Sequence, residues 1–195
     1  MADSIIIENK KIGRSFPSFI IAEIGINHNG SLKLALEMIK SAVDAGANCV
    51  KFQMRHLDSL YLNAGNADDF KENLGAQYVL DLLAKFSLSD EDMFKCFDYC
   101  RELKAIPLCT PWDEKSVDVL ESYGMSAYKV ASADLTNHDL LLKLASTKKP
   151  IICSTGMSSE EEIKTTADVL QKNNVQFAFL HCNSTYPPHM KDINL

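Results

Sequence analysis

Short apolar segments alternate with longer amphipathic segments along most of this chain. Six apolar runs have the length of a β-strand, and they lie at 19–24, 48–53, 105–109, 126–131, 150–154 and 176–181. Most lack the regular polar alternation of a half-exposed strand, which indicates strands buried on both faces. Because helical segments separate them, the pattern predicts parallel strands joined by crossover helices.

The segments between these runs have helical periodicity. The first covers 31–46 and ends at Gly46, where a C-terminal cap is expected. Its apolar face consists of Leu32, Ala35, Leu36, Ile39 and Val43. Further helices are expected at 89–103, 114–123, 138–146 and 159–172. The last of these opens with Ser159 and Glu162 at the spacing of a capping box.

Polar residues cluster at or just past the carboxyl ends of the predicted strands, and their distribution favours one of two folds. A closed barrel gathers such residues from many strands at one rim, whereas a doubly wound sheet gathers them at one switch point. Residues 25–30 (GINHNG) also lack the glycine spacing of a dinucleotide-binding turn. We therefore predict an α/β fold of the (β/α)8 TIM-barrel type. The polar residues are Glu23, Lys51, Gln53, Thr110, Lys129, Ser132, Ser154, Asn183 and Ser184.

The chain length changes this picture. A complete (β/α)8 barrel takes about 250 residues, and this chain has 195 residues and six predicted strands. We expect a hairpin or leader at 1–16 and a partial barrel at 17–195, truncated after strand six. Residues 54–76 form a long excursion between the second and third strands.

Composition excludes several classes of function. The net charge of −6 argues against a nucleic-acid-binding face. No apolar run is long enough to span a membrane, and the N-terminus lacks the features of a signal peptide, so a cytoplasmic protein is expected. The six cysteines lie mostly in apolar runs, which favours buried thiols over disulfides or a zinc site.

Four of the polar residues could bind an anion such as a phosphate group. Lys51 and Lys129 lie among apolar strand neighbours, where an unpaired lysine is costly to bury. The alternative is that each extends from a strand end to solvent. Ser132 and Ser154 lie at strand-to-helix turns, where they could donate to phosphate or cap a helix.

Glu23 is the strongest candidate for acid–base chemistry. It follows the apolar residues 19–22 at the inner end of a predicted strand. Burial there would favour the protonated carboxyl group and suit it to proton transfer. The alternative is a structural salt bridge with Lys51 or Lys129.

Six motifs together resemble the sialic acid synthases, which include the N-acetylneuraminate, legionaminate and pseudaminate synthases. These motifs are FIIAEIGINHNG, VKFQ, CTPWD, YKVASADLTN, PIICSTGM and LHCNSTYPP, in that order from residue 19 onward. The resemblance implies a barrel enzyme that condenses phosphoenolpyruvate with an N-acetylated hexose such as N-acetylmannosamine. Phosphate is released in this reaction.

The same resemblance implies roles for individual residues. Glu23 would manage proton transfer, and Lys51 and Lys129 would hold phosphoenolpyruvate together with Thr110, Ser132 and Ser154. Ser184 would lie beside the phosphate. The acceptor sugar would contact Gln53, Asn66, Asp134 and Tyr186, although Asp134 stands where related enzymes often carry glutamate.

The resemblance also implies a divalent metal, Mn²⁺ or Mg²⁺, and a homodimer for the full-length protein. It places the metal ligands beyond residue 195, so we expect none in this chain and no synthase activity from it alone. His28 and His181 have no histidine partner at ligand spacing, and a core or loop-ordering role is favoured for both. Two alternatives are an inactive truncated chain that binds phosphate-bearing ligands, and another phosphoenolpyruvate-condensing aldol-type synthase. The second would need more arginines than Arg14, Arg55 and Arg101 to hold a phosphorylated acceptor.

Overall fold

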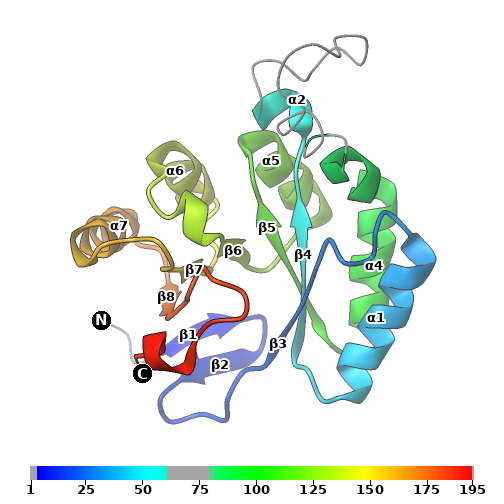
Figure 1. Ribbon diagram of the computed structural model, residues 1–195, viewed down its shortest axis with the longest axis horizontal. Helices are drawn as coiled ribbons and strands as arrows, with labels where there is room; N and C mark the ends of the chain where they lie inside the picture. The colour runs from blue at the N-terminus through cyan, green and yellow to red at the C-terminus, as the bar shows by residue number, and fades with distance from the viewer. Residues whose placement is uncertain (1–3, 61–79, 81, 195) are drawn as a thin grey trace. The chain divides into compact units, whose positions relative to one another are not determined.

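The computed structural model describes residues 4–60, 80 and 82–194. The chain divides into two compact units, one formed by 19–123 and the other by the N-terminal segment to residue 18 together with 124–195. Both units contain parallel strands alternating with helices, as the sequence pattern predicts (Figure 1).

The unit of residues 19–123 holds three parallel strands in sequence order. These are β3 (Ile21–Gly25), β4 (Cys49–Met54) and β5 (Ile106–Pro111). Its helices are α1 (Leu32–Asp44), the short α2 (Leu57–Leu60), α4 (Asp90–Glu102) and α5 (Glu114–Tyr123). Helices α1 and α4 lie side by side in Figure 1 and pack on the strands.

One face of β4 forms the centre of this unit's core. Phe52 is fully buried, and its ring lies edge-on to Phe97 of α4 with 6.1 Å between the centroids. Leu108 of β5 is also fully buried. Because side chains alternate along a strand, Lys51 and Gln53 project from the opposite face of β4. One face of β4 therefore packs against the helices, and the opposite face carries the candidate polar residues.

The second unit also has its parallel strands in sequence order. They are β6 (Tyr128–Val130), β7 (Ile151–Ser154) and β8 (Phe177–Leu180), with helices α6 (His138–Ser146) and α7 (Glu160–Lys172). Two short 3-10 helices, η1 (Ser132–Asp134) and η2 (Met190–Asp192), follow β6 and β8. The α7 N-terminus has the predicted capping box, in which Ser159 and Glu162 bond each other's backbone N–H groups.

An antiparallel hairpin belongs to this second unit. It is formed by β1 (Ser4–Ile7) and β2 (Lys10–Gly13). The N–H of Ile6 donates to the side-chain oxygen of Gln176 at 2.9 Å, and Ser126 donates to Glu8 at 3.0 Å. These bonds attach the hairpin next to the amino ends of β8 and β6. The expected division at residues 16 and 17 stays a prediction.

Candidate functional site

Glu23 and Lys51 form an ion pair at neighbouring positions of β3 and β4. The register pairs the two residues directly, and Lys51 Nζ lies 2.7 Å from Glu23 Oε1. The lysine side chain is only 6% exposed, whereas that of Glu23 is 55% exposed. Lys51 therefore does not extend to solvent. The expected burial of Glu23 is wrong, and the salt bridge left open as an alternative is present.

The pairing of β3 with β4 is irregular directly after Glu23. Their register shifts between Glu23 and Gly25, and Gly25 has a φ of +59°. Because Glu23 and Lys51 are register partners and form an ion pair, the carboxylate lies on the face of the sheet that carries Lys51.

Gln53 and Thr110 lie beside each other, nearer the carboxyl ends of β4 and β5 than Lys51. They are direct register partners of β4 and β5. Thr110 is 1% exposed, and its hydroxyl has no hydrogen-bond partner within the described residues. A buried polar atom without a partner is costly, so this hydroxyl is available to a ligand or a water molecule.

Lys129 and Ser154 come together in the second unit. Lys129 is 7% exposed and Ser154 is 8% exposed. The lysine ammonium donates to Ser154 Oγ and, at 2.7 Å, to the carbonyl oxygen of Val130. Lys129 is therefore buried and hydrogen-bonded, and it does not extend to solvent.

Ser132, Gly156 and Ser184 form a second cluster in the same unit. The N–H of Gly156 donates to Ser132 Oγ at 3.1 Å. A Cβ atom on Gly156 would lie 2.8 Å from Ser132 Oγ and 2.5 Å from Ser184 Oγ. Two hydroxyl groups and one backbone N–H thus converge where only glycine leaves room.

Neither Ser132 nor Ser154 caps a following helix. Asn137 caps α6 and Ser159 caps α7, each through its side-chain oxygen. Both hydroxyls instead accept a hydrogen bond from a protein donor, and neither has an acceptor in the described part of the chain. Each can therefore direct its own O–H proton to a ligand, and this arrangement suits an anion.

Three further predicted site residues are not among the contacts described above. Asp134 ends η1, and its Oδ1 accepts from Asn137 Nδ2 at 3.3 Å. Tyr186 is 91% exposed. Asn66 lies outside the described residues.

The histidines considered in the sequence have different environments. His28 is 1% exposed, and its Nδ1 accepts the N–H of Gly30 at 3.2 Å, which orders the loop after β3. Burial lowers the pKa of His28 below its ordinary value of 6.5. His181 lies exposed just past β8, so a core role is wrong for it, and the loop-ordering role stays a prediction. Among the described residues, no cluster of three or more histidine, cysteine or acidic side chains could hold a metal.

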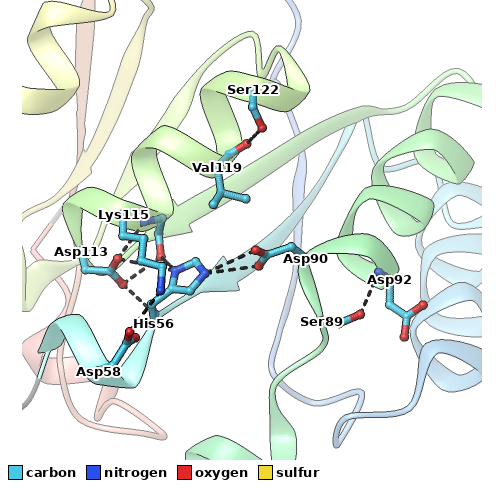
Figure 2. A network of polar contacts seen from close by, with 10 residues as sticks. His56, Asp58, Ser89, Asp90, Asp92, Asp113, Lys115, Val119 and Ser122 are labelled. Atoms are coloured by element: carbon cyan, nitrogen blue, oxygen red, sulfur yellow. Dashed lines mark hydrogen bonds and ion pairs between the residues drawn. The ribbon is translucent and has the colours of Figure 1, made fainter.

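The sequence analysis missed a polar network around His56, shown in Figure 2. His56 Nδ1 lies 3.0 Å from Ser116 Oγ, and Nε2 lies 3.4 Å from Asp90. Asp113 caps α5 by accepting the N–H of Ser116 at 2.7 Å, and it also accepts the N–H of His56 at 2.8 Å. Ser116 is fully buried, so this serine–histidine–aspartate arrangement cannot act as an exposed nucleophile. The network secures the segments that follow β4 and β5.

Two features outside these clusters complete the description. A groove of about 610 Å³ lies on the helical surface, lined by α1 residues and by Tyr99 of α4. None of its lining residues is one of the lysines, serines or threonine described above at the strand ends. In the described parts of the chain, no helix has the length and apolarity to cross a membrane.

The comparison with protein families is decisive. The NeuB family pattern matches residues 38–195. The chain belongs to the NeuB family. An N,N'-diacetyllegionaminic acid synthase from Legionella pneumophila is 35% identical, and the match covers 95% of this chain and 54% of that protein. The chain therefore spans about half the length of the curated relatives it matches.

Solved structures agree on the fold of this NeuB chain. An N-acetylneuraminic acid synthetase from Leptospira borgpetersenii has a TM-score of 0.87 at 31% identity, covering 98% of this chain and 63% of that one. A truncated 3-deoxy-D-arabino-heptulosonate 7-phosphate synthase from Thermotoga maritima has a TM-score of 0.63 at 15% identity, covering 90% and 55%. This second likeness shows the fold alone. The fold is thus the predicted (β/α)8-barrel type, represented here by its first six strands.

Proposed function

We propose that this chain carries substrate-binding and proton-transfer groups of a nonulosonic acid synthase. Such an enzyme condenses phosphoenolpyruvate with an N-acetylated hexose such as N-acetylmannosamine. Support comes from membership of the NeuB family and from relatives named as legionaminic and N-acetylneuraminic acid synthases.

One observation carries the assignment of the phosphate-binding groups. Ser132 and Ser154 both accept protein hydrogen bonds, so their own protons are free for a ligand. The buried Lys129 ammonium adds a positive charge to this donor set. Donors of this kind favour a multiply charged oxyanion over a neutral ligand, and Ser184 adds a further hydroxyl.

The other unit supplies a second set of groups in this proposal. The Lys51 ammonium and the buried Thr110 hydroxyl are assigned to phosphoenolpyruvate, and Gln53 to the acceptor sugar. Glu23 is assigned to proton transfer. Its exposure to solvent allows exchange of protons with water, while the bonded Lys51 holds its carboxylate in place. Asp134, Tyr186 and Asn66 remain proposed sugar contacts.

The proposed reaction joins C3 of phosphoenolpyruvate to the aldehyde carbon of the open-chain sugar. The electron pair of the enol double bond forms the new C–C bond, and the aldehyde oxygen takes up a proton. Water then adds at C2, and loss of inorganic phosphate leaves a 2-keto acid. Fixed positive charges and hydroxyl donors stabilise the negative charge that develops on the oxygens.

The described residues do not fit the divalent metal that the resemblance implies, because they offer no suitable ligand cluster. We derive no step through the metal, and its ligands are proposed to lie beyond residue 195. The homodimer of the full-length protein and its cytoplasmic location are likewise proposed from the resemblance.

Titration calorimetry of this chain with phosphoenolpyruvate tests the phosphate assignment. We expect measurable binding, and Lys129→Met should weaken it about tenfold or more, since a charged hydrogen bond contributes about 1.5–3 kcal/mol. Lys164→Met is the matched control. It removes the same charge from an exposed lysine on α7, and its affinity should equal that of the wild type.

A phosphate-release assay with N-acetylmannosamine and Mn²⁺ tests the second part of the proposal. This chain should bind phosphoenolpyruvate without turnover. A folded wild-type chain that does not bind phosphoenolpyruvate would overturn the binding assignment. Metal-dependent turnover would show that the metal ligands lie within the chain.

A further inference from the structure

A short hydrogen bond fixes the orientation of the Gln53 side-chain amide. Arg55 Nη2 donates to Gln53 Oε1 at 2.6 Å, just past the carboxyl end of β4. An arginine side chain has donors and no acceptors, so the amide atom facing it must be the oxygen. The NH₂ group of Gln53 is therefore turned away from Arg55.

The arginine is itself held in place. Its guanidinium carbon lies 4.7 Å from the centroid of the Trp112 ring, a distance typical of a cation–π stack. Trp112 follows β5, and its backbone N–H donates to the carbonyl oxygen of Met54 at 3.0 Å. A planar guanidinium stacked on a fixed ring loses little further freedom when it forms a hydrogen bond.

The NH₂ group of Gln53 lies close to Glu23. A Cβ atom built on Gly25 would be 3.3 Å from Gln53 Nε2 and 3.4 Å from Glu23 Oε1. An amide donor and a carboxylate acceptor therefore flank the same point above Gly25. A hydroxyl group can accept from the amide and donate to the carboxylate.

We propose that Arg55 is a positioning residue that presents the Gln53 NH₂ group beside Glu23, where the two side chains bind a hydroxyl of the ligand. Arg55 acts through Gln53 and does not contact the ligand. The identification of this ligand as the N-acetylated acceptor sugar rests on the proposed function. The orientation of the amide is independent of that function.

Nuclear magnetic resonance of the chain tests the orientation directly. In the wild type, the Gln53 NH₂ protons should show a nuclear Overhauser effect to the Gly25 α-protons. Arg55→Ala should abolish it, and Arg55→Lys, which keeps a donor but loses the planar stack, should restore it in part. Arg101→Ala is the matched control. Arg101 lies 4.8 Å from the Tyr123 ring centroid on α4, and its removal should leave the signal intact.

Titration with N-acetylmannosamine tests the consequence for binding. Arg55→Ala and Gln53→Ala should each weaken sugar binding about tenfold, with phosphoenolpyruvate affinity unchanged. The double variant should bind no more weakly than Gln53→Ala, because both changes remove one interaction.

The outcomes separate this inference from the proposed function. A signal that persists in folded Arg55→Ala, or additive losses in the double variant, would overturn the positioning role. Loss of the signal in Arg55→Ala supports the orientation. If the sugar does not bind, or binds equally to the wild type and Gln53→Ala, the sugar assignment of the proposed function fails.

Discussion

Replacement of Gly156 by alanine should strongly weaken phosphate binding while leaving the chain folded. The added Cβ would lie 2.5 Å from Ser184 Oγ and 2.8 Å from Ser132 Oγ, whereas ordinary contact begins at 3.4 Å. Both hydroxyls must retreat by at least about half an ångström. This movement also breaks the bond from the Gly156 N–H to Ser132.

The magnitude follows from the groups that move. Gly156 has no positive φ, so alanine is compatible with its backbone. The crowded atoms are ends of rotatable side chains, and we expect the free energy of unfolding to change by less than about 1 kcal/mol. Two displaced hydrogen bonds to a charged phosphate cost about 3 kcal/mol together, which lowers the affinity for phosphoenolpyruvate about 100-fold.

Calorimetry with phosphoenolpyruvate and urea denaturation measure the two effects separately. Gly46→Ala provides the opposite control, because Gly46 has a φ of +93° and open space around it. That variant should lose stability and keep its affinity for phosphoenolpyruvate. A folded Gly156→Ala chain with wild-type affinity would refute the assignment of the Ser132 and Ser184 hydroxyls to the phosphate.

Three further predictions concern other parts of the chain. Burial lowers the pKa of His28 in the folded state below 6.5, so the free energy of unfolding falls as the pH drops below 6.5, where the unfolded state takes up the proton first. In urea denaturation at several pH values, His28→Gln should reduce this dependence on pH. Thiol labelling at pH 8 should modify Cys182 fastest, because it is only half-buried, whereas burial raises the pKa of Cys96 and Cys100 to about 12. Cys182→Ser should therefore remove the fast phase of labelling. Phe97→Ala should lower the free energy of unfolding by about 3–5 kcal/mol, measured with urea, because the ring is fully buried; a loss below about 1 kcal/mol would contradict its place in the core.

The periodicity of the sequence was sufficient to predict the six parallel strands and the longer helices, although not the short α2, because each of these elements is locally consistent. Helix α5 covers the predicted range Glu114–Tyr123, and α6 covers His138–Ser146. The N-cap residues Ser89 and Ser159 begin their helices where the sequence places them. Local hydrogen bonding and one apolar face decide such boundaries.

The environment of Glu23 could not be predicted in the same way. The apolar residues before it indicate burial, but the side chain is 55% exposed, next to a register shift between Glu23 and Gly25. Such a shift depends on how two strands pair, and the local sequence around Glu23 does not indicate that pairing. The same limit applies to His181, which lies one position past the end of β8 and is exposed.

The chemistry of the strand ends depends on hydrogen-bond capacity, which residue types alone do not reveal. The sequence left the roles of Ser132 and Ser154 open, because a serine at a strand-to-helix turn can either cap the helix or donate to a phosphate group. The structure resolves the ambiguity by showing that Asn137 and Ser159 do the capping and that both hydroxyls accept protein hydrogen bonds. A hydroxyl whose acceptor role is satisfied by protein is left with a proton to donate.

The same reasoning separates the two lysines from ordinary surface charges. Lys51 and Lys129 are both almost fully buried, yet each has a different partner: a carboxylate for Lys51, and a hydroxyl and a carbonyl for Lys129. An ion pair with Glu23 offsets the charge of Lys51, so an arriving phosphate competes with that carboxylate. We therefore expect the contribution of Lys51 to phosphate affinity to rise when the Glu23 charge is removed. Calorimetry with phosphoenolpyruvate on Lys51→Met in the wild-type and Glu23→Gln backgrounds measures this difference: an equal loss of affinity in the two backgrounds would show that Glu23 does not offset the charge of Lys51.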